Sequence, residues 1–154
     1  LKEPLSKMVK VFVILFPSVA IAQLMIYSGV GQPSMVRYLA ELMSMLGKAY
    51  PAFAPFVGVM GAFVTGSTTI SNLVFGASQL ETAHVLGLNP TMVLALQLVG
   101  ATAGNAICLF NIIAAASVAG IKDYKAILRN NLLPTLLATL LAGLLGMAWL
   151  LLSG

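Results

Sequence analysis

The side chains of this sequence that could bind a small molecule are neutral, and they gather in two short clusters. One is the stretch GSTTISN at 66–72, and the other is GATAGN at 100–105, which Asn111 follows. Hydroxyl groups, carboxamides and the N–H groups of half-helix N-termini can together cradle an anion, whereas freed backbone carbonyls can hold a cation. The candidate binding residues are Gly66, Ser67, Thr68, Thr69, Ser71, Asn72, Gly104, Asn105 and Asn111.

Catalytic chemistry has little support in the sequence. No acid pair, phosphate-binding loop or dinucleotide glycine motif is present, and the only histidine is His84. Ser78 in GASQ loosely resembles a rhomboid-type nucleophile, but the motif lacks its final glycine. The single cysteine, Cys108, excludes an internal disulfide and a cysteine-based metal cluster. We therefore expect no enzyme, no cofactor and no metal site.

The composition of the 154-residue chain is that of an integral membrane protein. Sixty per cent of the residues are apolar and 8% are charged, against roughly 45–50% and about 25% in soluble proteins. The mean hydropathy of +1.01 agrees. The net charge of +4 comes from basic residues in the breaks between apolar runs rather than from a patch, so nucleic acid is not an expected partner. We expect an all-α integral membrane fold with the lipid bilayer as its surroundings.

Charge-free runs divide the chain into candidate membrane segments. Four runs lack Asp, Glu, Lys and Arg: 11–36, 49–80, 82–121 and 130–154. A charge at the centre of a membrane helix costs about 2.5–3.5 kcal/mol, and one crossing needs about 20 residues.

The outer runs each fit one spanning helix, predicted at 11–31 and 131–152. Between the first span and the second run, apolar residues recur at helical spacing, which predicts an amphipathic surface helix at 33–47. Arg37 and Glu41 are i,i+4 neighbours in that helix and are expected to pair.

The two middle runs have awkward lengths. The stretch 50–80 is too long for one upright crossing and too short for two with a turn, and GSTTISN lies in its middle. Backbone exposed at membrane depth survives only inside protein or against a water-filled cavity. We therefore predict a re-entrant helical hairpin at 50–80. The stretch 90–120 is predicted to be a discontinuous helix broken near 104–111, as in half of an inverted-repeat transporter.

The distribution of Lys and Arg predicts the orientation. With the hairpin in place, one face receives residues 1–10 and 121–129. That face holds Lys2, Lys7, Lys10, Lys122, Lys125 and Arg129, whereas the other holds Arg37 and Lys48. The positive-inside rule then places 1–10 and 121–129 in the cytoplasm. A single crossing at 50–80 would give a weaker and reversed split.

The two clusters and their flanks resemble the L-lactate permease family. The resemblance rests on GAFVTGSTTISNLVFGASQ at 61–79, the LGLNP loop and GATAGNAICLFNIIAAASVAGIKDYKAILRNNLLP at 100–134. It covers roughly residues 10–152. It implies the C-terminal portion of a multi-pass secondary carrier of the ion-transporter superfamily in the plasma (inner) membrane, with the N-terminal half of the same protein as its partner. The implied activity is proton-coupled uptake of lactate and glycolate, which are small carboxylates.

Two positions depart from this resemblance. The family carries an acidic residue where this chain has Thr68 and a lysine near Asn105, so the joint absence of both charges indicates the loss of an internal pair. No Asp, Glu or His lies within the predicted spans. If the carrier is coupled to H⁺, the proton is therefore expected to travel on the substrate or on a residue outside this segment. Na⁺ is the alternative coupling ion, because hard cations take neutral oxygen ligands.

Two other functions stay open. One is a carrier of the same superfamily that takes a different anion. The other is a non-transporting membrane scaffold subunit, in which the polar clusters merely join helices.

Overall fold

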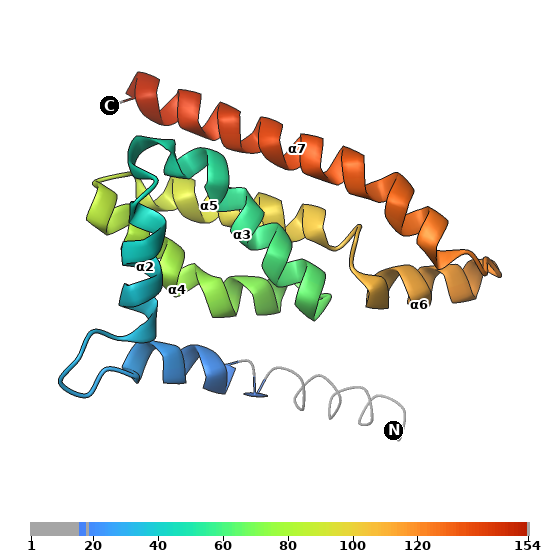
Figure 1. The fold of residues 1–154 in the computed structure, drawn as a ribbon, viewed down its shortest axis with the longest axis horizontal. Coiled ribbons are helices and arrows are strands. Elements are labelled where there is room, and N and C mark those ends of the chain that lie inside the picture. Colours follow the sequence, from blue (N-terminus) through green and yellow to red (C-terminus); the bar gives the residue numbers. More distant parts are fainter. Residues whose placement is uncertain (1–15, 18, 154) are drawn as a thin grey trace, which may run out of the picture.

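The computed structural model describes residues 16–17 and 19–153, and in that part of the chain every regular element is helical. Residues 19–27 form a helix that precedes the labelled ones. The others, shown in Figure 1, are α2 (Met35–Ser44), the 3-10 turn η1 (Gly47–Ala49), α3 (Tyr50–Thr65), α4 (Thr68–Leu86), α5 (Pro90–Gly104), α6 (Leu109–Ala119) and α7 (Tyr124–Ser153). The prediction of an all-α chain is confirmed for these residues. Residues 1–10, predicted to be cytoplasmic, and residues 11–15 and 18 of the predicted first span lie outside the described part.

Helix α5 lies at the centre of the molecule. It packs against α3, α4 and α7, while α2 packs against the outer side of α4 and α6 packs against α7. Helix α7 runs along the long axis of the molecule, and α2 crosses near one end (Figure 1). The turn between α6 and α7 lies at the opposite end (Figure 1).

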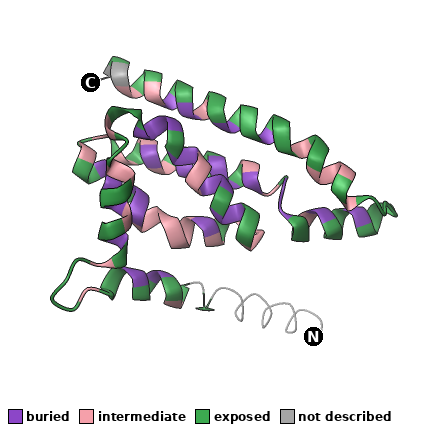
Figure 2. Ribbon diagram, in the orientation of Figure 1, coloured by how far each residue is buried: buried purple, intermediate pink, exposed green. Residues whose placement is uncertain are grey.

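Helix α7 is the described helix that by itself is long and apolar enough to cross a membrane. Its candidate span is Tyr124–Leu150, with a mean hydropathy of 1.8, and only 22% of its most apolar part is buried. Figure 2 shows its outer side exposed along most of its length. Helices α5 and α6 are long and apolar enough to cross only as a pair, which is bent by 42° at the break between them. Exposed apolar surface of this kind suits contact with lipid acyl chains.

The turn between α3 and α4 follows from two residues. Gly66 ends α3 with a φ of +70°, a left-handed conformation that glycine adopts without a Cβ penalty. Its N–H donates to the Ala62 carbonyl at 2.7 Å. Ser67 then begins α4, because its hydroxyl accepts the Ile70 N–H at 3.3 Å. The chain thus reverses over two residues.

Short polar side chains also begin α5 and α7. The Asn89 side chain accepts the N–H groups of Thr91 and Met92 at 3.0 and 3.3 Å. The Asp123 carboxylate accepts the Ala126 N–H at 3.0 Å in the first turn of α7. A carboxylate at this position also interacts favourably with the helix dipole.

Helices α3 and α5 approach each other closely through glycines. A methyl group at Gly100 would overlap the backbone of Pro55, and one at Gly104 would lie 2.6 Å from the Val59 carbonyl oxygen. Gly100 and Gly104, which have the GxxxG spacing, therefore allow close helix contact. This contact holds the first arm of the α3–α4 pair against α5.

Helix α2 is attached to α4. Val36 and Ala40 are buried on its inner side. The predicted pair of Arg37 and Glu41 is confirmed, with Nε and Oε1 3.5 Å apart. Arg37 also reaches Glu81 of α4, with its Nη1 3.9 Å from Oε1. Helix α4 continues past that charge to Leu86, beyond residue 80 where the charge-free run ends.

Candidate functional site at the hairpin tip and the helix break

The turn between α3 and α4 meets the gap between α5 and α6. We call residues 65–69 the hairpin tip and residues 105–108 the helix break. A methyl group at Gly66 would lie 3.2 Å from the Cys108 sulfur and 3.6 Å from Oδ1 of Asn111. The Asn111 amide also donates to the Gly66 carbonyl at 3.3 Å. The two polar clusters of the sequence are therefore in direct contact.

Thr68 and Asn105 form the shortest link between the two segments. Nδ2 of Asn105 donates to the Thr68 hydroxyl at 2.6 Å, and that hydroxyl donates to the Ala101 carbonyl at 3.4 Å. These are the two positions at which the sequence lacks the charges implied by the resemblance. Their contact agrees with the interpretation that an internal pair was lost as a unit.

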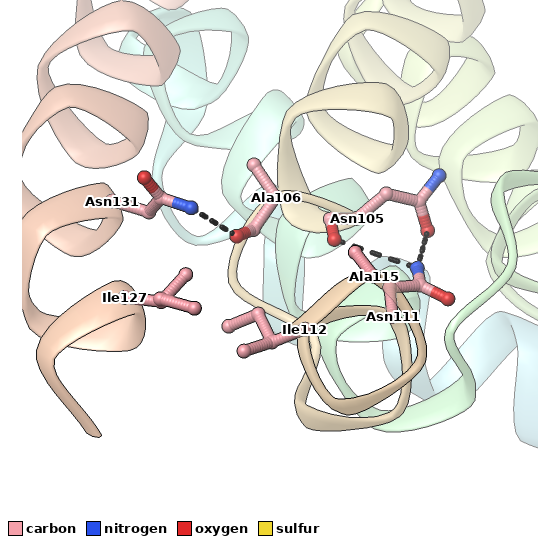
Figure 3. Close-up of a pocket in the computed structure, with 7 residues that line it drawn as sticks. All are labelled: Asn105, Ala106, Asn111, Ile112, Ala115, Ile127 and Asn131. Carbon is pink, nitrogen blue, oxygen red and sulfur yellow. Dashed lines mark hydrogen bonds between the residues drawn. The ribbon is translucent and has the colours of Figure 1, made fainter. Parts of the chain in front are cut away.

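Asn111 ties the first turn of α6 to both segments. Besides the Gly66 carbonyl, its Nδ2 lies 3.4 Å from the backbone oxygen of Asn105 and 3.3 Å from Oδ1 of Asn105. Figure 3 shows the two contacts with Asn105. A carboxamide has two N–H groups, so three acceptors must share them. One side chain therefore responds to any movement of the tip relative to the break.

Four helix ends converge here. Helices α3 and α5 end at the site and leave carbonyl groups without helical partners, while α4 and α6 begin there and present N–H groups. Ser67 caps α4, whereas Cys108, at the equivalent position of α6, makes no side-chain cap bond within the described residues. Helix N-termini carry roughly half a positive charge. The arrangement can thus receive an anion at the N-termini and a cation at the carbonyls.

Ser71 lies away from this meeting point. It is completely buried, donates to the Gly58 carbonyl at 3.0 Å and accepts Nε2 of Gln97 at 3.2 Å. Gly104 is buried against Val59 in the α3–α5 interface. The structure therefore places these two predicted binding residues in helix packing.

The last two predicted residues differ in exposure. Thr69 is exposed at the start of α4. Oδ1 of Asn72 is buried and has no hydrogen-bond partner in the part of the chain that the structure describes. A buried acceptor without a donor is costly, which makes Asn72 a candidate for contact with a ligand or with another segment.

The core also contains a buried row of polar side chains that was not predicted from the sequence. We call Tyr50, Gln79, Gln97 and Ser71 the polar ladder. The Tyr50 hydroxyl donates to Oε1 of Gln79, and Nε2 of Gln79 donates to Oε1 of Gln97 at 2.8 Å. Gln79 and Gln97 lie in charge-free runs. A glutamine in an apolar segment needs a hydrogen-bonding partner when it is buried. These two glutamines could therefore have indicated a buried polar contact between helices.

A cavity of about 260 Å³ opens between the helix break and α7. Figure 3 shows its lining: Asn105, Ala106, Asn111, Ile112, Ala115, Ile127 and Asn131. Nδ2 of Asn131 donates to the Ala106 carbonyl at 3.0 Å, which fixes the break to α7. Asn131 was not predicted as a site residue, because polar residues are common at the first position of a membrane span.

Apolar exposed helices around a polar meeting point of four helix ends define an all-helical membrane protein with an internal polar site. The family model for L-lactate permeases matches residues 1–152. The chain belongs to the L-lactate permease family. Members of this family are transporters, not enzymes.

The curated relatives agree with this assignment. A Haemophilus influenzae protein, provisionally named an L-lactate permease, is 35% identical over 135 residues, which cover 86% of this chain and 25% of the relative. The L-lactate permease of Escherichia coli K12 is 32% identical over 108 residues, or 70% of this chain and 20% of the relative. The glycolate permease of the same strain is 35% identical over 82 residues, or 53% and 15%. The chain thus spans a quarter or less of these relatives, and no solved structure matches it.

Proposed function

We propose that this chain is the C-terminal part of a secondary active transporter of small 2-hydroxy monocarboxylates such as lactate and glycolate. The N-terminal half of the same protein completes it in the plasma membrane. Two relatives are named for these substrates. The observation that carries the proposal is the contact of the hairpin tip with the helix break through Thr68, Asn105 and Asn111.

In this proposal the substrate carboxylate binds at the N-termini of α4 and α6, where N–H groups and neutral side chains replace its water. Helices α3 and α4 act as a re-entrant hairpin, and α5 and α6 cross as one discontinuous helix of an inverted repeat. Residues 1–10 and 121–129 face the cytoplasm. In Figure 1, α2 and the α6–α7 turn lie at opposite ends of the molecule. This arrangement supports the orientation, because Arg37 of α2 and Lys122 of the turn then lie on different faces of the membrane.

The proposed coupling ion is H⁺. Glu41, Glu81 and Asp123 are the acids of the described residues, and none of them lies in the hairpin tip or the helix break. The proton therefore travels on the substrate carboxylate or on a residue of the N-terminal half. The alternative ion is Na⁺, for which the carbonyls and hydroxyls of the tip and break offer neutral oxygen ligands.

The test is uptake of radiolabelled lactate by the full-length parent in proteoliposomes. We expect uptake under an imposed pH gradient without sodium. Uptake only under a sodium gradient would overturn the proton coupling but keep the carrier. Competition by unlabelled glycolate is expected, whereas competition only by an unrelated anion would indicate a different substrate. No uptake under either gradient would support the scaffold alternative.

A further inference from the structure

We propose that the cavity between the helix break and α7 holds the alkyl end of the transported 2-hydroxy acid, and that Ile112 and Ile127 select its chain length. The inference rests on the proposed function and adds a specificity site to it. It concerns residues that lie outside both polar clusters of the sequence.

The cavity adjoins the proposed carboxylate site, and Asn105 and Asn111 lie between the two. Asn105 and Asn111 line it, and the same two side chains contact Thr68 and Gly66 of the hairpin tip. When the carboxylate of a ligand binds at the hairpin tip, only the side chains of Asn105 and Asn111 therefore lie between the ligand and the cavity. The volume of about 260 Å³ lies just below the range of about 300–1,000 Å³ typical of small-molecule sites. It suits a ligand of a few heavy atoms.

Three asparagines and four apolar residues line the cavity. Ile112 of α6 and Ile127 of α7 point toward each other in Figure 3, and Ala115 adds to the same wall. Among the described residues, the lining includes no ionisable side chain. Transfer of a charged carboxylate into such a space is unfavourable, whereas transfer of a methyl or ethyl group is favourable. The cavity therefore discriminates between acids by their alkyl end.

One wall of the cavity is held in place by a hydrogen bond. Asn131 of α7 donates to the Ala106 carbonyl in the helix break, so the distance between α7 and the break is fixed. Ile127 lies one helical turn before Asn131 on α7, on the same side of the helix. The hydrogen bond thus holds the turn that carries Ile127 close to the helix break, and a wall held in this way can disfavour a chain that is one carbon too long.

The experiment compares uptake of glycolate, lactate and 2-hydroxybutyrate, which differ by one carbon each, by the full-length parent in proteoliposomes. Ile127→Ala enlarges the cavity and should raise the preference for 2-hydroxybutyrate over glycolate. Ile127→Phe fills the cavity and should lower the preference for lactate over glycolate. One methylene in an apolar pocket changes specificity by about 10-fold or more, so we expect shifts of about 10-fold in the kcat/KM ratios.

Leu137 supplies the matched control, since it is an exposed apolar residue of the same helix outside the cavity. Leu137→Ala and Leu137→Phe should leave the ratios unchanged. If the Ile127 variants do not reach the membrane, Ala115→Leu fills the same space from α6 and should also lower the preference for lactate. Unchanged ratios with normal glycolate uptake would overturn this inference alone. If the unmodified parent takes up none of the three acids, the proposed function itself is overturned.

Discussion

Thr68 and Asn105 satisfy each other without charge at the point where the hairpin tip meets the helix break. Two neutral groups lose less hydration energy on burial than an ion pair, so such a pair can join segments at lower cost than opposite charges. A carboxylate at position 68 alone could accept the Asn105 amide but could not donate to the Ala101 carbonyl. The pair is therefore expected to behave as one unit under mutation.

Thr68→Asp should lower the stability of the full-length parent by about 1–3 kcal/mol, because an ionised carboxylate cannot donate to the Ala101 carbonyl as the half-buried Thr68 hydroxyl does. Adding Asn105→Lys should restore much of this loss, because the two side chains start within hydrogen-bond distance. The measurement is the melting temperature of the purified protein in detergent. Equal melting temperatures of the single and double variants would show that the two positions do not interact.

Gly66 combines a backbone requirement with a contact, and Gly120 separates the two effects. Both have a φ of +70°, but a methyl group at Gly120 would meet no atom within 4 Å. Changing either residue to Ala should destabilise the protein by about 1–2 kcal/mol, the cost of the left-handed conformation. Only Gly66→Ala pushes the hairpin tip away from Cys108 and Asn111, so only this variant should lose most lactate uptake. Equal losses of uptake in both variants would assign no special role to the tip.

At the scale of elements, the α3–α5 interface allows no added atoms at Gly100. Gly100→Ala should lower the melting temperature and separate α3 from α5, because the methyl group would overlap the Pro55 backbone. Gly76 is the matched control, since it lies inside α4 and a methyl group there would meet nothing within 4 Å. Gly76→Ala should be neutral or stabilise the protein by up to about 1 kcal/mol. A Gly100→Ala variant that melts like the Gly76→Ala variant would contradict the close packing.

The sequence was most informative where polar residues interrupt apolar runs. The tip at Gly66 and the break after Gly104 were predictable, because Ser, Thr, Asn and Gly have few other reasons to gather there. The full length of α4 was not, since Glu81 ends the charge-free run while its carboxylate lies at the surface beside Arg37. The polar ladder could not be predicted either. Which side chain faces Gln79 depends on how far α5 is shifted along α4, and the sequence alone does not specify that shift.

At the scale of the whole molecule, the orientation can be tested by thiol labelling. His84 is exposed near the end of α4 and Lys125 is exposed at the start of α7, two helix ends that lie at opposite ends of the molecule in Figure 1. Cys108 is buried and can be replaced by Ala. In this background, His84→Cys in intact cells should react with an impermeant maleimide. Lys125→Cys should react only after permeabilisation, because the positive-inside rule places it in the cytoplasm. The reverse pattern would invert the topology, and equal labelling would exclude the hairpin arrangement.

The polar ladder has a direction. The Tyr50 hydroxyl donates to Gln79, the amides of Gln79 and Gln97 donate onward, and the Ser71 hydroxyl ends the row at the Gly58 carbonyl. To relay a proton, each group would have to accept one on one side and release another on the other side. A carboxamide nitrogen has no lone pair to offer, and a backbone carbonyl has no proton to pass on. The ladder thus joins three helices without conducting protons. In the proposed proton-coupled carrier, this row of hydrogen bonds therefore offers no path for protons through the core of the segment.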